Sequence, residues 1–173
     1  MKKNLFLMLM LLTVAISASA KKTVLKYSLK VTSTPKTEQA NQITFDCFPP
    51  SEYNTTFIRY FTCINSTDER VYIEWENARL SGSKIVFGDD SRITMKQPKA
   101  DEAVSGHSSS IIRDITGDVY IGSTHLGSLY DARNLKKNIG SKNTTYLTIP
   151  IRFSDGTIEE FELEYTVWYE IPN

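Results

Sequence analysis

The chain has 173 residues, of which 40% are hydrophobic and 23% are charged, with 8 Gly and 6 Pro. This composition is typical of a globular domain and excludes collagen-like, low-complexity and wholly disordered chains. Because 20 basic residues balance 20 acidic ones, the chain lacks the excess of positive charge on which nucleic-acid-binding proteins depend, and we expect no nucleic-acid partner.

The N-terminal segment has the three zones of a secretory signal peptide. Residues 1–3 (Met-Lys-Lys) are charged, residues 5–16 are apolar, and residues 18–20 (Ala-Ser-Ala) supply the small side chains that precede a cleavage site. The apolar run is shorter than the ~20 residues that span a bilayer. We expect residues 1–20 to be removed during export to the periplasm or the cell exterior. Residues 21–173 are then predicted to form one domain with no transmembrane segment.

Alternation of apolar and polar residues, the pattern of a half-buried strand, begins soon after this segment. Residues 23–32 and 43–47 alternate in this way, and Pro49-Pro50 ends the second strand because proline has no backbone N–H to donate. Residues 57–64 are largely apolar on both faces, which predicts a central strand. This strand is expected to form a hairpin with residues 70–76.

The two cysteines, Cys47 and Cys63, lie in two of these predicted strands. An exported chain with an even number of cysteines favours a disulfide. The bond would close a loop of ~16 residues and stabilise the fold by roughly 3 kcal/mol. Two buried free thiols are the alternative. Neither arrangement predicts a redox or zinc site, because the sequence has no Cys-x-x-Cys motif.

The middle of the chain predicts a second hairpin followed by a long loop. Residues 84–87 and 92–95 flank a Gly-Asp-Asp-Ser sequence that favours a turn. Residues 96–110 contain a proline, a glycine and four serines, and so long a loop in a compact domain is functional or mobile. Further short strands are expected at 111–115 and 119–121.

Residues 129–139 have apolar side chains at helical spacing. Ser128 and Asp131 form a weak capping box, and Gly140 favours termination of the helix. The pattern predicts a helix of two to three turns, with an irregular crossover as the alternative.

The C-terminal segment shows the clearest alternation. Residues 147–153 and 158–171 flank a Ser-Asp-Gly-Thr sequence, and Asp-Gly between alternating strands is a strong signal for a hairpin turn. Apolar residues occupy the odd positions from 161 to 171. Because Ile158 is out of phase with them, we expect a β-bulge near Glu159-Glu160.

Consecutive hairpins with at most one short helix predict an all-β fold, specifically an antiparallel two-sheet sandwich of the immunoglobulin-like type. A flattened barrel is the alternative. If the first and last strands pair, lysines would meet glutamates across the ladder and favour that pairing. The residues concerned are Lys26, Lys30, Glu160, Glu162 and Glu164.

Three patterns contain reactive residues, and each has a simpler structural explanation. His107 lies in a serine-rich segment upstream of Asp114, but a serine triad requires groups from separate rigid elements. The glutamates at 160, 162 and 164 occupy one face of a strand, which is typical of a solvated surface rather than of a glycosidase pair. The acidic pairs lack the spacing of a calcium loop. These pairs are Asp89 with Asp90 and Asp114 with Asp118. We therefore expect no catalytic residue, no metal site and no cofactor.

Trp168 is the best candidate for a binding residue. It falls on the polar face of the last strand, beside Glu164 and Glu170. An exposed tryptophan among polar residues is suited to stack against a sugar ring or a protein side chain. Alternatively, the helix or the long loop covers this face. Trp75, by contrast, shares its face with β-branched residues and is predicted to belong to the core.

Two segments, 65–78 and 147–151, resemble small exported bacterial β-sandwich proteins of unknown function. The sequences are Asn-Ser-Thr-Asp followed after two residues by Val-Tyr-Ile-Glu-Trp-Glu-Asn-Ala, and Leu-Thr-Ile-Pro-Ile. Both describe strands and turns, so the resemblance implies a fold and an export route and carries over no catalytic residue.

The features together predict a non-catalytic exported module that binds a protein or a carbohydrate at the cell envelope or outside the cell. Two alternatives remain. One is an envelope-structural or assembly subunit whose open edge accepts a strand from a neighbour. The other is a secreted hydrolase, which would require a deep pocket lined by carboxylates.

Overall fold

The computed structural model describes residues 22–53, 55, 58–87, 100–117 and 129–172. Most of the alternating segments form strands, because each strand can bury one face against a second layer. In chain order the elements are β1 (Val24–Val31), the 3-10 helix η1 (Ala40–Gln42), β2 (Ile43–Cys47), β3 (Ile58–Asn65), β4 (Val71–Ile73), β5 (Arg79–Leu80), β6 (Ser83–Phe87), β7 (Glu102–Val104), β8 (Ser108–Gly117), α2 (Ala132–Lys137), β9 (Lys142–Arg152) and β10 (Ile158–Glu170).

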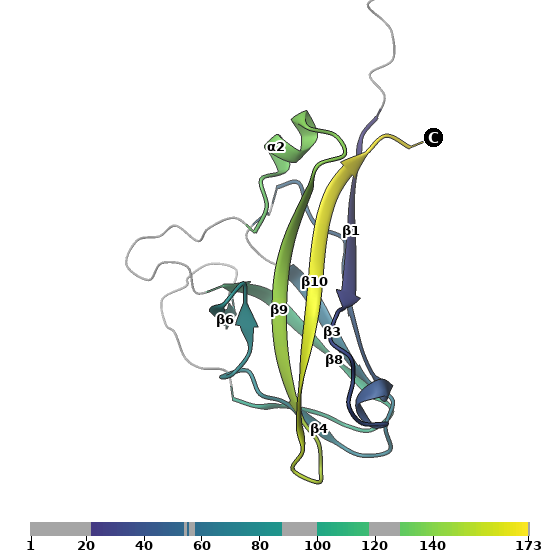
Figure 1. Cartoon of the computed structure of the whole chain (residues 1–173). Coiled ribbons are helices and arrows are strands. Elements are labelled where there is room, and N and C mark those ends of the chain that lie inside the picture. Colours follow the sequence, from purple (N-terminus) through teal and green to yellow (C-terminus); the bar gives the residue numbers. More distant parts are fainter. Residues whose placement is uncertain (1–21, 54, 56–57, 88–99, 118–128, 173) are drawn as a thin grey trace, which may run out of the picture.

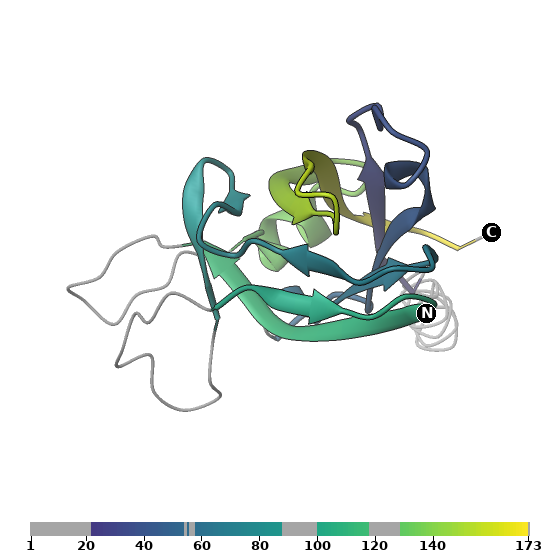
Figure 2. The ribbon, with the colours of Figure 1, turned by 90° about the horizontal axis from the view of Figure 1, so that it is seen from below.

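Every pairing between the described strands is antiparallel, in the order β1-β10-β9-β5-β6-β8-β3-β2, with β4 joining β7 to β9. The long strands β1, β10 and β9 belong to a curled sheet A, and β2, β3 and β8 belong to a smaller sheet B. Sheet B crosses behind sheet A (Figure 1), and the view from below shows the two layers (Figure 2). The predicted all-β antiparallel class is therefore confirmed.

The apolar core lies between the two sheets. Buried residues from both sheets and from α2 form one cluster. From position 161 to 169, every odd-numbered side chain of β10 is buried, as the alternation predicts. Trp75 is 2% exposed, which confirms that it belongs to the core. The two edge strands approach each other where the Tyr27 hydroxyl donates to the carbonyl oxygen of Cys47 at 2.9 Å.

The predicted hairpin between residues 57–64 and 70–76 does not form. β3 pairs with β2 and β8 in sheet B, whereas β4 pairs with β7 and β9 in sheet A. Residues 66–70 therefore carry the chain from one layer to the other. Residues 105–107 make the second crossing beside it, from β7 in sheet A to β8 in sheet B. We call these two segments, together with the flanking Asn65, the corner.

The predicted loop at 96–110 is wrong over the part that the structure describes. Residues 102–104 form β7, and residues 108–110 begin β8. Polar side chains support these strands: the Glu102 carboxylate accepts a hydrogen bond from Nε1 of Trp75 at 3.3 Å and another from the Ser110 hydroxyl. A pattern search for apolar alternation misses strands that are held in this way.

β10 runs without the predicted β-bulge. Its register against β9 is unbroken from Ile158 opposite Arg152 to Trp168 opposite Lys142. The prediction assumed that the inward series begins with an apolar residue, but Glu159 takes the first inward position. This side chain is 6% exposed; its Oε2 accepts from the backbone N–H of Lys36 at 3.0 Å, and its buried Oε1 has no hydrogen-bond partner among the described residues.

The predicted helix is present but shorter than expected. Within 129–139 only the six residues of α2 are helical. Asp131, rather than Ser128, caps the helix, because its Oδ1 accepts from the backbone N–H groups of Arg133 and Asn134 at 3.0 Å each.

The first and last strands pair with each other, which the sequence analysis raised only as a condition. Lys30 of β1 lies opposite Glu164 of β10, and Lys26 lies opposite Trp168. The ammonium group of Lys26 reaches diagonally to the carboxylate of Glu170 at 3.2 Å. An exposed pair of this kind contributes about 0–1 kcal/mol, so the pairing rests mainly on the ladder and on inward apolar burial.

The predicted disulfide is absent, because Cys47 and Cys63 are buried free thiols. The register places Cys47 opposite Phe61 and Cys63 opposite Phe45. The two cysteines are therefore diagonal neighbours rather than a facing pair. Burial raises the pKa of each thiol to about 12.

Several predictions lie outside the described residues. They concern the signal peptide at 1–20, the strands at 92–95 and 119–121, and Asp89, Asp90 and Asp118.

Candidate functional site

Trp168 lies on the outer face of sheet A, as predicted. Even-numbered residues of β10 point away from the core, and Trp168 is partly exposed among them. Its Nε1 donates to Oε2 of Glu170 at 3.3 Å, and the ammonium group of Lys142 lies 5.4 Å from the centre of its ring. The predicted neighbour Glu170 is therefore in direct contact with the indole.

The helix does not cover this face. α2 packs on the inner side of β10, where Lys136 lies over the ring of Tyr169 at 5.6 Å. The described part of the long loop, residues 100–110, forms β7 and the start of β8. Neither of the two elements that would have covered Trp168 does so within the described residues.

A floor of hydroxyl groups lies one step along the strands from Trp168. Thr166 of β10 faces Thr144 of β9, and their hydroxyl oxygens are 2.9 Å apart. The Thr166 hydroxyl also donates to Oε1 of Glu164 at 3.1 Å. Although Thr166 is on the outer face, it is only 4% exposed. The third predicted residue, Glu164, therefore contacts Thr166, which lies between it and Trp168 on β10, and does not touch Trp168 directly.

Tyr146 belongs to the same face, and the sequence analysis missed it. It lies in β9 opposite Glu164 and is 58% exposed. The predicted strand began at Leu147, whereas β9 begins at Lys142. The threonines and tyrosine at 144–146 have high β-propensity, which is the signal that extends the strand backwards. We use "the Trp168 face" for the outer surface formed by Lys26, Ser28, Lys30, Lys142, Thr144, Tyr146, Thr148, Glu162, Glu164, Thr166, Trp168 and Glu170.

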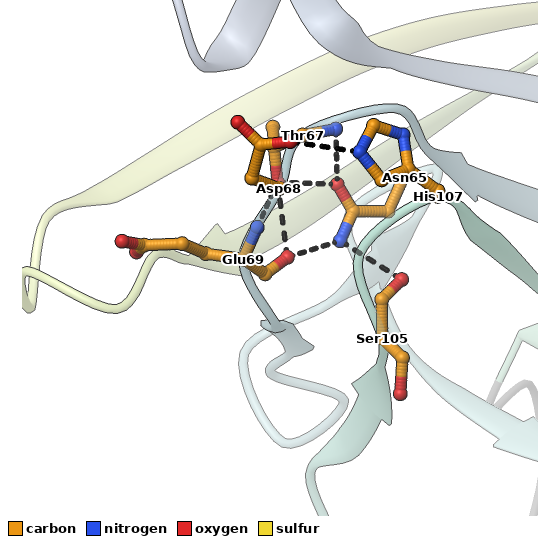
Figure 3. A network of polar contacts seen from close by, with 6 residues as sticks. All are labelled: Asn65, Thr67, Asp68, Glu69, Ser105 and His107. Carbon is orange, nitrogen blue, oxygen red and sulfur yellow. Dashed lines mark hydrogen bonds and ion pairs between the residues drawn. The ribbon is translucent and has the colours of Figure 1, made fainter.

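His107 is part of the corner rather than of a serine triad. Its Nε2 lies 2.8 Å from Oδ1 of Asp68, and both side chains are largely exposed (Figure 3). Its backbone N–H donates to the carbonyl oxygen of Thr67 at 3.1 Å. A φ of 50° places His107 in the left-handed region. These contacts indicate that His107 stabilises the turn between β7 and β8.

Asn65 organises the corner from within. Its side-chain Nδ2 donates to the carbonyl oxygens of Glu69, Val104 and Ser105 at 2.7, 3.1 and 3.2 Å. Its Oδ1 accepts from the backbone N–H and the hydroxyl of Thr67 at 3.0 and 2.7 Å. One buried amide therefore ties both crossing segments together, and most of this network is visible in Figure 3.

A small pocket of about 160 Å³ opens beside the corner. Its walls come from η1, from the 67–71 segment and from the turn between β9 and β10, and most of them are polar or charged. The lining residues are Gln39, Gln42, Thr67, Asp68, Glu69, Arg70, Val71, Phe153 and Ser154. This volume falls below the 300–1,000 Å³ that is usual for ligand sites.

The row of glutamates on β10 follows the predicted strand face. Glu160 and Glu162 are exposed on the outer side, and Glu164 is partly covered by its neighbours. Among the residues that the structure describes, no group of three or more His, Cys, Asp or Glu side chains is arranged to hold a metal ion.

The backbone edge of β2 is engaged at its two ends. The N–H of Cys47 donates to Oδ1 of Asp46 at 2.7 Å, and its carbonyl oxygen accepts from Tyr27. The N–H of Ile43 donates to the carbonyl oxygen of Ala40. A strand from a neighbouring molecule would have to displace these contacts to pair with β2.

In comparisons with known proteins, no family model, curated protein or solved structure matches the chain. In the described ranges, no helix combines the length and the apolar character that a membrane crossing requires.

Proposed function

We propose that the chain is an exported binding module that recognises a protein or a carbohydrate through the Trp168 face. The observation that carries this proposal is a partly exposed indole beside a hydroxyl floor, on a sheet face that α2 leaves uncovered. A rigid aromatic ring with polar groups at its edge supplies both apolar contact area and orientation. Export rests on the N-terminal sequence alone.

The proposal treats the module as non-catalytic. The two reactive patterns on described residues have structural roles: His107 braces the corner, and the glutamates of β10 form a row along one strand. A reactive site needs a nucleophile, a base and an orienting group that converge. The secreted hydrolase is therefore the weaker alternative.

Assembly through the β2 edge is also weaker, so a strand from a neighbour would have to add at β1, the other end of the strand order. Side chains and neighbouring backbone already engage the groups at both ends of the β2 edge. For the fold we propose an immunoglobulin-like sandwich, which the two antiparallel layers support. The flattened barrel is the alternative, and one observation favours it: β5 and β6 connect the two sheets into one continuous path of paired strands.

Affinity capture from the native organism tests the proposal. The bait is the purified protein, compared with Trp168→Ala and with Phe48→Ala, which removes an exposed aromatic ring from the β2 side of the molecule. We expect a partner that is lost with Trp168→Ala and retained with Phe48→Ala. Identical captures by all three baits would refute the role of Trp168. Mass analysis of the exported protein should give an N-terminus at Lys21.

A further inference from the structure

We infer that the ligand of the Trp168 face is an extended, uncharged oligosaccharide that contacts Trp168 and Tyr146 at the same time. This inference rests on the proposed function and names its ligand class. It depends on the separation of the two aromatic rings, on the charge balance of the face, and on which backbone groups the face leaves available.

The two rings are too far apart for one sugar. Tyr146 is level with Glu164, which lies four residues before Trp168 on β10. At ~3.4 Å per residue, the two side chains are rooted about 14 Å apart along the strands. A monosaccharide can therefore stack on one ring only, whereas a chain of several sugars reaches both.

The surface between the rings suits hydroxyl groups. At the level between Trp168 and Tyr146, Thr144 of β9 and Ser28 of β1 are partly exposed, whereas Thr166 between them is only 4% exposed. The flat C–H face of a sugar packs on an aromatic ring while its hydroxyls bond to polar groups at the ring's edge. This alternation of ring, hydroxyl floor and ring therefore matches an amphipathic sugar chain.

The charges of the face cancel. Three lysines (Lys26, Lys30 and Lys142) accompany three glutamates (Glu162, Glu164 and Glu170). Lys26 already pairs with Glu170 at 3.2 Å. A balanced and partly paired set of charges gives no electrostatic attraction to a polyanion or polycation. It therefore favours a neutral chain.

Trp168 and Tyr146 stand on strands that have no free edge, and the edge of this face belongs to β1. β10 is paired with β1 and β9, and β9 is paired with β10, β4 and β5. A peptide cannot add to these strands by β-augmentation, which is how sheets commonly bind extended peptides. This observation favours the sugar chain over an extended peptide.

Lys142 does not block the indole. A lysine over a partly exposed tryptophan is held only weakly, so an arriving sugar can displace the ammonium group. Once displaced, Lys142 can donate to the sugar hydroxyls.

The test is a titration of the purified protein with cellohexaose, chitohexaose and maltohexaose and with the corresponding disaccharides, followed by tryptophan fluorescence and calorimetry. We expect at least one hexasaccharide to bind, and its disaccharide to bind about tenfold or more weakly because only one ring is reached. Trp168→Ala and Tyr146→Ala should each weaken binding of the hexasaccharide about tenfold.

Two variants serve as matched controls. Phe48→Ala and Tyr53→Ala remove exposed aromatic rings, 55% and 99% exposed, that do not belong to the Trp168 face. They should leave the affinity unchanged. An unchanged circular dichroism spectrum and urea midpoint confirm that each variant is folded.

The results separate this inference from the proposed function. No binding of any neutral hexasaccharide at millimolar concentration overturns the inference, and so does binding that is independent of chain length or of Tyr146. If capture of a protein still depends on Trp168, the binding module stands and the sugar ligand is wrong. If both the titration and the capture are independent of Trp168, both proposals are wrong.

Discussion

The substitution Asn65→Asp isolates the hydrogen-bond donors of the corner. The two side chains have nearly the same shape, so the two contacts to Thr67, which Oδ1 accepts, are retained. The three contacts that Nδ2 donates, at 2.7–3.2 Å, are lost. An oxygen then faces three carbonyl oxygens in a site where the residue is fully buried.

The loss can be estimated from these contacts. Each broken hydrogen bond to a buried carbonyl costs ~1 kcal/mol, and the buried charge adds more, for a total of about 3–5 kcal/mol. Domains of this size unfold with ~5–15 kcal/mol, so the variant loses a large share of its stability. The melting temperature should fall by on the order of 10 °C.

The pH dependence has a definite sign. An unpaired buried carboxyl has a pKa above its value in the unfolded chain, so the folded variant is favoured while the introduced group is protonated. Its deficit relative to the natural protein should therefore be smallest near pH 4 and should grow as the pH rises towards 7.

Urea unfolding followed by tryptophan fluorescence measures this deficit, because Trp75 is buried in the core. Asn41→Asp is the matched control: its exposed Nδ2 makes one hydrogen bond, to the carbonyl oxygen of Thr37 at 3.2 Å. The control should change the free energy of unfolding by less than about 0.5 kcal/mol. A deficit for Asn65→Asp below ~1 kcal/mol, or one that is flat between pH 4 and pH 7, would show that the amide does not hold the corner.

Three further predictions concern other positions. Gly106→Ala should destabilise the protein by about 1–3 kcal/mol in urea unfolding, because the new Cβ would clash with the backbone oxygen of Asp68. A loss below ~0.5 kcal/mol would contradict this reasoning. With each pKa near 12, the thiolate fraction of Cys47 and of Cys63 should be only ~10⁻⁴ at pH 8, so both should react slowly with a thiol reagent in the folded protein. In urea the reagent should titrate two thiols per chain. A titration that finds no thiol would reveal a disulfide. Hydrogen bonds from a tyrosine and a lysine lower the pKa of Glu52. The ionised carboxylate should therefore add about 0.5 kcal/mol to the free energy of unfolding at neutral pH, and this stabilisation should be lost as the pH falls through the folded-state pKa. If Glu52→Gln is still less stable than the natural protein at pH 2, these hydrogen bonds are not the cause.

The parts of the fold that follow local rules could be predicted from the sequence. The β9–β10 hairpin forms because Asp155-Gly156 supplies the turn and the alternation fixes which side is buried, and Gly156 has a φ of +86°. The sequence did not predict that β1 pairs with β10. It showed only that, if the two strands pair, side chains of opposite charge face each other. The antiparallel class followed from the same patterns.

The corner could not be predicted in this way. Two apolar runs separated by the short polar segment 66–70 have the pattern of a hairpin. Whether the chain turns back or crosses to the other layer depends on the amide of Asn65 meeting carbonyl groups some forty residues away. Such a contact leaves no periodic signal in the sequence.

The binding surface was predicted in part. Trp168 and Glu170 are in contact, and Glu164 lies on the same face. Tyr146 was missed because the strand was started too late. The burial of Glu159 was missed because a charged residue was not expected to begin an inward-facing series.

Among the described strands β1 leaves the ribosome first, and its only ladder partner among them is β10, the last. The eight residues of β1 must therefore wait until β10 (Ile158–Glu170) has been synthesised before their hydrogen bonds can form. Pairings between such distant segments form slowly because a long loop must close first. If the chain is exported from its N-terminus, as proposed above, β1 crosses the membrane well before β10, and this strand pair can form only after both have crossed.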